Sequence, residues 1–396
     1  MTSGITAPRG FRAAGVESGI KKDAPDLALV VADTDCAAAG VFTTNRAAAP
    51  PVAVAREHLA SGRARALVVN SGCANAATGP GGRADAEEMA AVTAKAVGCA
   101  VYDVLVASTG VIGVRLPMDR LRAGIASAVA ELSADHGGDA ARAIMTTDTR
   151  PKEASVTVTL GGTPCTVGGM AKGAGMIAPN MATMLAFFTT DATVPPPLLH
   201  RALVAAVGES LNRITVDGDT STNDCAVILA SGRAGAPKLE NAGTDYAAFE
   251  DALTDVARQL SGMLVRDGEG VTRVAEVRVE GARTAEEADR VARVVAESPL
   301  VKTALYGGDP NWGRILAAAG RAGVDLDGDR VSIWIGDVQV AENGVAREYE
   351  EKDAAAAMEE DPVRFRIRLA EGEATGWMLT SDLSHRYVDI NAHYRT

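Results

Sequence analysis

The stretch KGAGMIAPNMATMLAFFTTD spans residues 172–191 and joins a glycine-rich segment to an apolar run. The run MLAFFTTD has the apolar and aromatic composition of a buried strand. One hydroxyl, that of Thr183, lies between Ala182 and Met184 at the junction. Most threonines in apolar runs only bond a nearby carbonyl. Here the small Ala182, together with Pro179 and the glycines upstream, allows a strained turn, which makes Thr183 a candidate for chemistry.

Thr183 has no histidine near it in the sequence to act as a general base. A threonine can still be a nucleophile when its own α-amine is the base. A free α-amine titrates at about 8, close to the working pH of an enzyme. This arrangement requires Thr183 to be an N-terminus, so the bond between Ala182 and Thr183 must be cleaved.

The composition indicates an acidic protein with a sizeable core. The chain has 396 residues, of which 47% are hydrophobic, and a formal net charge of −12. Scattered acidic charge disfavours binding to a phosphate backbone, so we expect no nucleic-acid partner. The five cysteines are widely spaced without a CxxC, which argues against a disulfide framework or a structural metal site and fits a reducing compartment. Because no signal peptide or membrane span is evident, we expect a cytoplasmic protein without a membrane partner.

Short β-branched runs alternate with helical patterns, which predicts an α/β protein of about two or three domains. A smaller α+β domain is expected from about residue 275. A T-x-x-E capping box predicts a helix that begins at Thr284. The predicted strands are 27–31, 64–70, 102–108, 153–160, 225–231, 275–281, 331–340 and 365–370, and the other predicted helices are 84–97, 117–134, 195–211, 245–270 and 351–360.

Two loops that carry hydroxyls and glycines follow predicted strands: NSGCAN at 70–75 and ASTGVIG at 107–113. Backbone amides in such loops can stabilise an oxyanion, although plain strand-to-helix turns have the same composition. Ser71 and Cys73 are further nucleophile candidates, but no GxSxG elbow surrounds either residue.

Three other motifs favour turns over ligand sites. GGMAKGAG (168–175) lacks a phosphate-loop pattern and predicts a turn at which the backbone approaches a substrate or the chain itself. DGDTSTND (217–224) is rich in oxygen ligands but lacks the EF-hand spacing, so a turn is favoured over a calcium site. GGDPNWGR (307–314) predicts a turn in which Arg314 is a candidate anion contact.

Together these segments resemble the ornithine acetyltransferase family of arginine biosynthesis, which includes bifunctional glutamate N-acetyltransferases. The resemblance covers the chain nearly end to end, in the family's order. It is carried by KGAGMIAPNMATMLAFFTTD, NSGCAN, ASTGVIG, AIMTTDTRPK (143–152), DGDTSTND, RDGEG (266–270), SPLVKTALYGGDPNWGRI (298–315) and YVDINAHYRT (387–396).

The resemblance implies that Thr183 first cleaves the bond after Ala182 and then carries the acetyl group. It implies an oxyanion hole at Thr109 and Gly110. The substrate contacts that it implies are Thr146 or Thr147, Lys172, Thr183, Glu269, Asn391 and Thr396.

The resemblance also implies a self-processing αββα-type sandwich, similar to that of the self-processing aminopeptidases. Residues 1–182 would form an α chain and 183–396 a β chain, and we expect an α2β2 assembly. Within the β chain, about 183–274 would complete the main α/β domain and about 275–396 would form the C-terminal α+β domain.

The implied reaction moves acetyl from N2-acetylornithine to glutamate through an acetyl-threonine. Acetyl-CoA is a further co-substrate in bifunctional members, and no metal or organic cofactor is expected. The alternatives are a monofunctional transferase, a self-processing aminopeptidase or amidase, and a non-catalytic binding protein with the same fold.

Overall fold

The computed structural model describes residues 4–178 and 184–393, which divide into two compact units. The first unit contains the residues up to Asn212 and Asp219–Leu264. The second contains Arg213–Gly218 and, among the described residues, 265–393. The expected domain boundary near residue 275 lies inside the second unit, which also takes in the RDGEG turn. The expected division between residues 182 and 183 lies outside the described residues.

The first unit alternates strands and helices, as the sequence predicts. Its strands are β1 (Phe11–Val16), β2 (Leu27–Phe42), β3 (Arg63–Cys73), β4 (Val104–Val111), β5 (Lys152–Leu160), β6 (Thr163–Lys172), β7 (Leu185–Thr190) and β9 (Cys225–Ala230). Its helices are α1 (Pro50–His58), α2 (Gly79–Val97), α3 (Met118–Ala130), α4 (Gly137–Ala143), α5 (Pro196–Gly208) and α6 (Thr244–Arg266), whose last residues belong to the second unit.

The strands of the first unit form one mixed sheet, which β2 divides into two layers. The order is β4-β3-β2-β9-β7-β6-β5, with β1 paired to β2. The pairing of β2 with β3 shifts between Val31 and Cys36, and beyond this irregularity β2 also pairs with β9. One buried cluster contains Leu67 of β3 together with Met170 of β6 and Phe187 of β7. The two halves of the sheet therefore share a core as two β layers.

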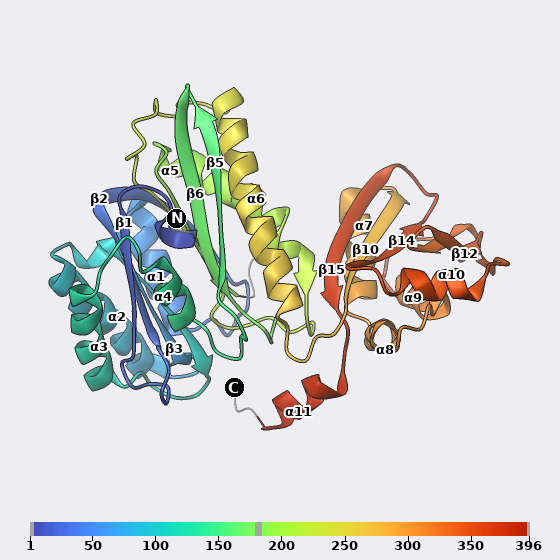
Figure 1. Cartoon of the computed structure of the whole chain (residues 1–396), viewed down its shortest axis with the longest axis horizontal. Coiled ribbons are helices and arrows are strands. Elements are labelled where there is room, and N and C mark those ends of the chain that lie inside the picture. The colour runs from blue at the N-terminus through green and yellow to red at the C-terminus, as the bar shows by residue number, and fades with distance from the viewer. Residues whose placement is uncertain (1–3, 179–183, 394–396) are drawn as a thin grey trace. The chain divides into compact units, whose positions relative to one another are not determined.

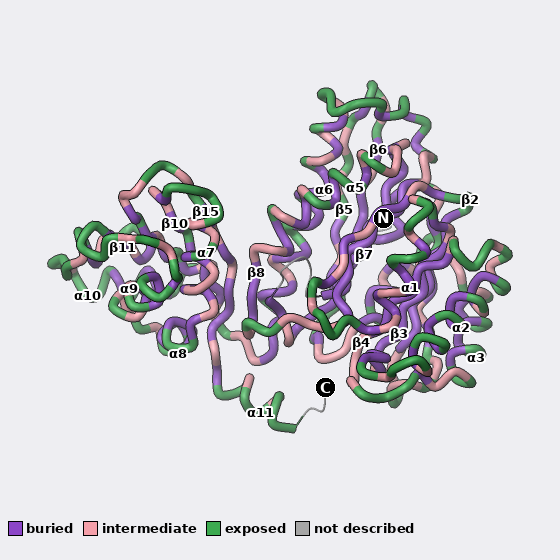
Figure 2. The backbone as a smooth tube through the Cα atoms, turned by 180° about the vertical axis from the view of Figure 1, so that it is seen from behind, coloured by how far each residue is buried: buried purple, intermediate pink, exposed green. Residues whose placement is uncertain are grey.

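Helices cover the outer faces of both β layers (Figure 1). Met89 of α2 and Ile125 of α3 join Val68 of β3 in one buried cluster. On the other side, α6 packs over β6, where a Cβ at Gly169 would lie 3.1 Å from Leu260 Cδ1. Figure 2 shows that the strands between these helices are largely buried. The layer order is therefore α–β–β–α, which confirms the predicted sandwich.

The apolar run that follows residue 183 forms the predicted buried strand. All six residues of β7 are buried, and the strand lies between β6 and β9 in the sheet. The prediction of a turn at GGMAKGAG is wrong in part, because GGMAK belongs to β6 and the turn begins at Gly173. Gly168 is required in this strand because a Cβ there would collide with the carbonyl oxygen of Gly4. The glycine thus allows the chain to approach itself.

The second unit is a smaller α+β assembly. Its sheet has the order β13-β12-β11-β14-β10-β15-β8, and Val291 of α7 packs with Val277 of β10 in its core. Thr284 caps α7 by accepting a hydrogen bond from the Glu287 amide at 3.2 Å, as predicted. The strands are β8 (Ile214–Thr215), β10 (Val274–Ala282), β11 (Ser332–Ile335), β12 (Val338–Glu342), β13 (Val345–Ala346), β14 (Val363–Arg368) and β15 (Ala374–Ser381). The helices are α7 (Ala285–Ala296), α8 (Pro299–Gly307), α9 (Trp312–Gly320), α10 (Glu351–Ala357) and α11 (His385–His393).

Three predicted strands are wrong in extent. Residues 331–340 form a hairpin of β11 and β12, because Gly336 turns the chain with a φ of 56°. Residues 101–103 are a 3-10 turn that precedes β4. Strand β2 has 16 residues, of which only 27–31 were predicted. Across residues 4–178 and 184–393, no helix combines the length and apolar character that crossing a bilayer requires.

Candidate active site

The two glycine-containing loops meet at one end of the first sheet. β3 and β4 are parallel neighbours, and their ends pair Ser71 with Thr109 and Gly72 with Gly110. Gly110 has a φ of 127°, and a Cβ there would collide with the backbone of Gly72. The two expected oxyanion-hole residues therefore lie at a tightly packed strand end that admits only glycine at position 110.

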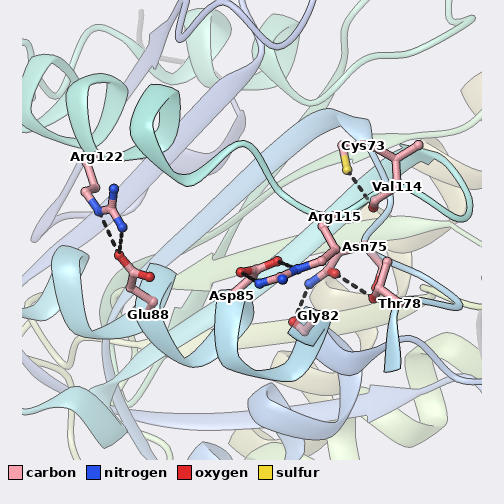
Figure 3. Close-up of polar contacts among 9 residues, drawn as sticks. All are labelled: Cys73, Asn75, Thr78, Gly82, Asp85, Glu88, Val114, Arg115 and Arg122. Carbon is pink, nitrogen blue, oxygen red and sulfur yellow. Dashed lines mark hydrogen bonds and ion pairs between the residues drawn. The ribbon is translucent and has the colours of Figure 1, made fainter. Parts of the chain in front are cut away.

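Contacts behind these loops hold them in place (Figure 3). The Cys73 thiol donates to the Val114 carbonyl at 3.2 Å, which joins the first loop to the second. Arg115 binds the carboxylate of Asp85 in a bidentate pair, with N–O distances of 2.6 and 2.8 Å. These contacts fix the backbone on both sides of the paired strand ends.

Ser71 and Cys73 are not placed as nucleophiles, so these two candidates from the sequence are wrong. Ser71 is fully buried, and its hydroxyl donates to the Ala143 carbonyl at 2.6 Å. Burial raises the pKa of the Cys73 thiol, which favours the unreactive protonated form. Both side chains instead stabilise the loop.

Lys172, at the end of β6, joins predicted site residues from three segments. Its ammonium donates to Thr109 Oγ1 at 3.3 Å and to Thr146 Oγ1 at 2.7 Å. Lys172 is 8% exposed, so solvent screens its charge only weakly. The sequence left Thr146 and Thr147 as alternatives, and it is the hydroxyl of Thr146 that Lys172 reaches.

The start of β7 lies beside Lys172. The described chain resumes at Met184, and β7 begins at Leu185, which pairs with Lys172 in β6 and with Cys225 in β9. On the other side of residues 179–183, Ala178 is held by Thr220, whose hydroxyl donates to the Ala178 carbonyl at 3.1 Å. Three predicted site residues lie outside the described residues: Ala182, Thr183 and Thr396.

Asp148 is a buried carboxylate that sequence reasoning missed. It accepts hydrogen bonds from Lys152 Nζ at 2.7 Å, the Thr146 amide at 2.9 Å and the Gly173 amide at 2.7 Å. Burial alone would raise the pKa of Asp148, but the charges of Lys172 and Lys152 and these hydrogen bonds lower it to about 2. Asp148 therefore stays ionised and fixes the segments that carry Thr146 and Lys172. The sequence signal that could have indicated this ion pair is an aspartate four residues before a lysine within AIMTTDTRPK.

Asp224 is a second missed carboxyl, directly before β9. It is 2% exposed and accepts hydrogen bonds from Ser221, while its Oδ2 has no hydrogen-bond partner among the described residues. Burial raises the pKa of Asp224 well above its usual value, although the charge of Lys172 opposes this effect. The protonated form is thus favoured. Within the described ranges, no group of three or more His, Cys, Asp or Glu side chains is arranged to hold a metal ion.

In the second unit, Glu269 and Asn391 lie together. Asn391 Nδ2 donates to Glu269 Oε2 at 2.7 Å, and Glu269 is 7% exposed. The hydroxyl of Ser384, just before α11, donates to the Gly270 carbonyl at 2.6 Å. This bond fastens the helix that carries Asn391 to the turn that carries Glu269. Two of the predicted substrate contacts therefore form one local group.

The candidate anion contact Arg314 has a structural role. Its guanidinium donates to the Leu300 carbonyl at 2.9 Å and to Thr303 Oγ1 at 3.3 Å. The Asn311 side chain caps α9 by accepting from the Arg314 amide at 3.2 Å. The GGDPNWGR segment thus joins α8 to α9, in place of the predicted anion site.

Comparisons with known proteins identify relatives along the whole chain. A protein-family model described as "ArgJ family" matches residues 12–396. The arginine biosynthesis bifunctional protein ArgJ of Symbiobacterium thermophilum is 50% identical over 401 residues, covering 100% of this chain and 99% of that protein. The protein of the same name from Dehalococcoides mccartyi is 49% identical, with 99% and 97% coverage. The crystal structure of the ArgJ protein from Bacillus halodurans matches with a TM-score of 0.52 and 43% identity, covering 54% of this chain and 100% of that one.

Proposed function

Because the chain belongs to the ArgJ family, we propose that it is a self-cleaving acetyltransferase of arginine biosynthesis that moves acetyl from N2-acetylornithine to glutamate. One observation carries the proposal. The Lys172 ammonium holds the hydroxyls of Thr109 and Thr146, and its strand flanks the start of β7, which follows Thr183. Segments far apart in the sequence thus supply, at one place, the residue types that acyl transfer needs.

In the cleavage step that we propose, the Thr183 hydroxyl attacks the Ala182 carbonyl and its proton passes to the leaving nitrogen. The peptide bond is replaced by an ester between the Ala182 acyl group and Thr183 Oγ. Water then hydrolyses this ester, which leaves a carboxylate on Ala182 and a free α-amine on Thr183. Both reactions pass through a tetrahedral oxyanion, which the Thr109–Gly110 strand end is suited to stabilise.

The length of the solved relative supports this cleavage. The whole Bacillus halodurans chain matches only 54% of this chain. That share of 396 residues is about 214 residues, the same length as the stretch from residue 183 to residue 396. A relative that exists as a separate chain of this length is what cleavage before residue 183 produces.

The transfer that we propose uses the new amine as its base. The amine takes the proton of the Thr183 hydroxyl as Oγ attacks the acetyl carbonyl, and the proton leaves with the ornithine amine. The amine of glutamate then attacks the acetyl ester, and Thr183 Oγ regains a proton. Lys172 is suited to hold a substrate carboxylate, and Glu269 with Asn391 to hold the ornithine side-chain ammonium. Thr396 is proposed as a further substrate contact.

Mass spectrometry of the purified protein tests the proposal. Two fragments that divide before Thr183 are expected, and Thr183→Ala should abolish both cleavage and transfer. Thr183→Ser is the matched control, because it keeps a hydroxyl nucleophile and should retain cleavage. An intact chain with full transfer activity would refute the mechanism.

Transfer assays separate the alternative functions. An aminopeptidase or amidase would release acetate from N2-acetylornithine whether or not glutamate is present, and a binding protein would do neither. Because the curated relatives are named bifunctional, we propose that acetyl-CoA also acetylates glutamate here. Release of free thiol from acetyl-CoA that depends on glutamate is the expected result, and no release would leave a monofunctional transferase.

We propose that the reaction needs no metal or organic cofactor, because each step uses only hydroxyls, amines and hydrogen-bond donors of the chain. We further propose an α2β2 assembly, which native mass spectrometry would test. All five cysteines are free thiols, which supports the proposed location in the reducing cytoplasm.

A further inference from the structure

The two substrates of the proposed reaction pose a recognition problem, and the inference rests on that proposed function. N2-acetylornithine and glutamate share an α-carboxylate, but the first ends in an ammonium and the second in a γ-carboxylate. A ping-pong enzyme binds both in turn at the same nucleophile. The γ-carboxylate of glutamate has no counterpart in N2-acetylornithine. If Lys172 serves the shared α-carboxylate, the acceptor needs a second cation.

Lys21 supplies a second ammonium close to the loops of the candidate site. Its ammonium donates to the carbonyl of Met145, the residue before Thr146, at 3.0 Å. Its side-chain stem packs on the neighbouring loop, where a Cβ at Gly72 would lie 2.9 Å from Lys21 Cγ. Gly72 pairs with Gly110. Lys21 therefore bridges the oxyanion loop and the segment that carries Thr146, although it lies far from both in the sequence.

The backbone around Lys21 is fixed by a buried carboxylate. Asp26 is unexposed and accepts hydrogen bonds from the amide of Lys21 at 2.9 Å and the amide of Ser18 at 2.7 Å. Asp26 thus holds the loop before β2 through main-chain donors. The Lys21 ammonium extends away to Met145, toward the candidate site.

The Lys21 ammonium lies within reach of other charges at this place. Asp26 and Asp148 attract it and Lys172 repels it. An ammonium has three donors, and the acceptor for Lys21 among the described residues is the Met145 carbonyl. Burial and the charge of Lys172 lower the pKa of Lys21, whereas Asp26 and Asp148 raise it, so a bound carboxylate would stabilise its charged form.

We propose that Lys21 binds the γ-carboxylate of glutamate and thereby selects the acceptor, while Lys172 serves the α-carboxylate that both substrates share. Lys21 is then a specificity residue for the second half-reaction only. A residue with a purely structural role would affect both half-reactions alike.

The test compares the two half-reactions in Lys21→Met. In ping-pong kinetics, kcat/KM for each substrate reports its own half-reaction. A charge-assisted hydrogen bond contributes about 1.5–3 kcal/mol, so kcat/KM for glutamate should fall about 10- to 100-fold. The value for N2-acetylornithine should stay within about twofold. The preference for glutamate over glutamine, an acceptor of similar shape without the charge, should fall by the same factor as kcat/KM for glutamate.

Matched variants make the result decisive. Lys22→Met removes the neighbouring exposed lysine and should change neither half-reaction. Lys21→Gln is a second neutral variant and should lose kcat/KM for glutamate as Lys21→Met does. Self-cleavage at the normal rate shows that the site of this variant has folded. Lys21→Arg should recover part of the glutamate preference. Equal losses in both half-reactions, or an unchanged glutamate preference, would overturn the inference.

A separate measurement tests the proposed function itself. Incubation with N2-acetylornithine alone should give an acetylated β chain by mass spectrometry. If no acetyl-enzyme forms, the proposed function is wrong. If acetyl-enzyme forms and Lys21→Met still prefers glutamate as the unmodified enzyme does, only the role of Lys21 is wrong.

Discussion

Lys152 and Lys302 are two buried lysines, one in each compact unit, with different partners. Lys152 lies 2.7 Å from the Asp148 carboxylate, and their side chains are 1% and 0% exposed. Lys302 is 3% exposed and donates to Thr380 Oγ1 at 3.2 Å and to the carbonyl of Ser381. The first lysine therefore touches a carboxylate, whereas the second touches uncharged oxygens.

The two buried groups differ in whether their pKa favours the charged form near neutral pH. Burial would raise the pKa of Asp148, but the charges of Lys172 and Lys152 and the hydrogen bonds to Asp148 lower it to about 2. Burial lowers the pKa of Lys302 to about 8, although the charges of Asp217, Asp382 and Glu297 raise it. The charges and hydrogen bonds around Asp148 therefore outweigh its burial, whereas the charges around Lys302 do not. The first unit thus gives the site a fixed charge pattern, and the second contains a lysine that titrates near pH 8.

The largest expected effect comes from removing the carboxylate of the first pair. Asp148→Asn should lower the free energy of unfolding by about 3–5 kcal/mol at neutral pH, because it leaves buried ammonium groups without their partner. Chemical denaturation followed by circular dichroism measures this change. Asp139→Asn is the control, since its partner Arg142 is 56% exposed and the pair should contribute under about 1 kcal/mol.

Acid should weaken the same pair in unmodified protein. The pKa of Asp148 is about 2 in the folded chain and 3.8 as its ordinary value, so its contribution is complete above pH 3.8 and is lost as the pH falls toward 2. The stability difference from Asp148→Asn should therefore shrink by about 2 kcal/mol over that range. A difference that does not change with pH would mean that Asp148 is not ionised in the folded protein.

The pKa of Lys302 predicts a second rise of stability with pH, this time at alkaline pH. The pKa of Lys302 is about 8 in the folded chain and 10.5 as its ordinary value, so the unfolded chain binds more protons between these values. Stability from this residue therefore rises with pH over that window, by about 3 kcal/mol. Denaturation at pH 7.5 and 10.5 should show this rise relative to Lys302→Met. The exposed Lys352→Met should match the unmodified protein at both pH values.

The fixed charge of the first unit should also matter for catalysis. Lys172→Met should lower kcat/KM for both substrates about 30- to 100-fold, because it removes the cation proposed for the shared α-carboxylate. Steady-state kinetics of both half-reactions measures this loss. Lys238→Met, at an exposed lysine of the same unit, should have no effect. A loss confined to glutamate would exchange the roles assigned to Lys172 and Lys21.

The smallest expected effect concerns the exposed helix of the second unit. Asn391→Ala removes one hydrogen bond to Glu269, so KM for N2-acetylornithine should rise several-fold, corresponding to about 1 kcal/mol. Because α11 is largely exposed, the free energy of unfolding should change by less than about 0.5 kcal/mol. His393→Ala at the end of the same helix is the kinetic control. Equal KM values for both variants would remove Asn391 from the site.

The fold could be predicted where local pattern and tertiary structure agree. The β-branched runs at 64–70 and 225–231 lie in β3 and β9, and the capping box at Thr284 begins α7. The second half of β2 was missed because residues 32–40 are mostly alanine, glycine and aspartate, which have weak strand propensity. Pairing with β9 forms that half, and no local signal in the sequence contains this information.

The site was predictable as a set of motifs but not as a charge arrangement. Lys172, Thr109 and Thr146 were singled out from three segments, and the structure brings them together. Asp148 and Lys21 were not, because their significance depends on burial and on neighbours that are distant in sequence. A carboxylate in a turn has the same local sequence whether it is solvated or surrounded by lysines.

The position of β7 in the middle of its sheet has a consequence for how the protein folds. After cleavage before residue 183, β6 and β2 would belong to one chain and β7 and β9 to the other. The register nevertheless pairs Val167–Lys172 with Leu185–Thr190, and Ala37–Phe42 with Cys225–Ala230. Folding of the precursor is a first-order event, whereas refolding of the cleaved protein would be second order and would slow on dilution. The proposed cleavage would thus leave two products that cannot rebuild the sheet at the rate at which the precursor assembles it.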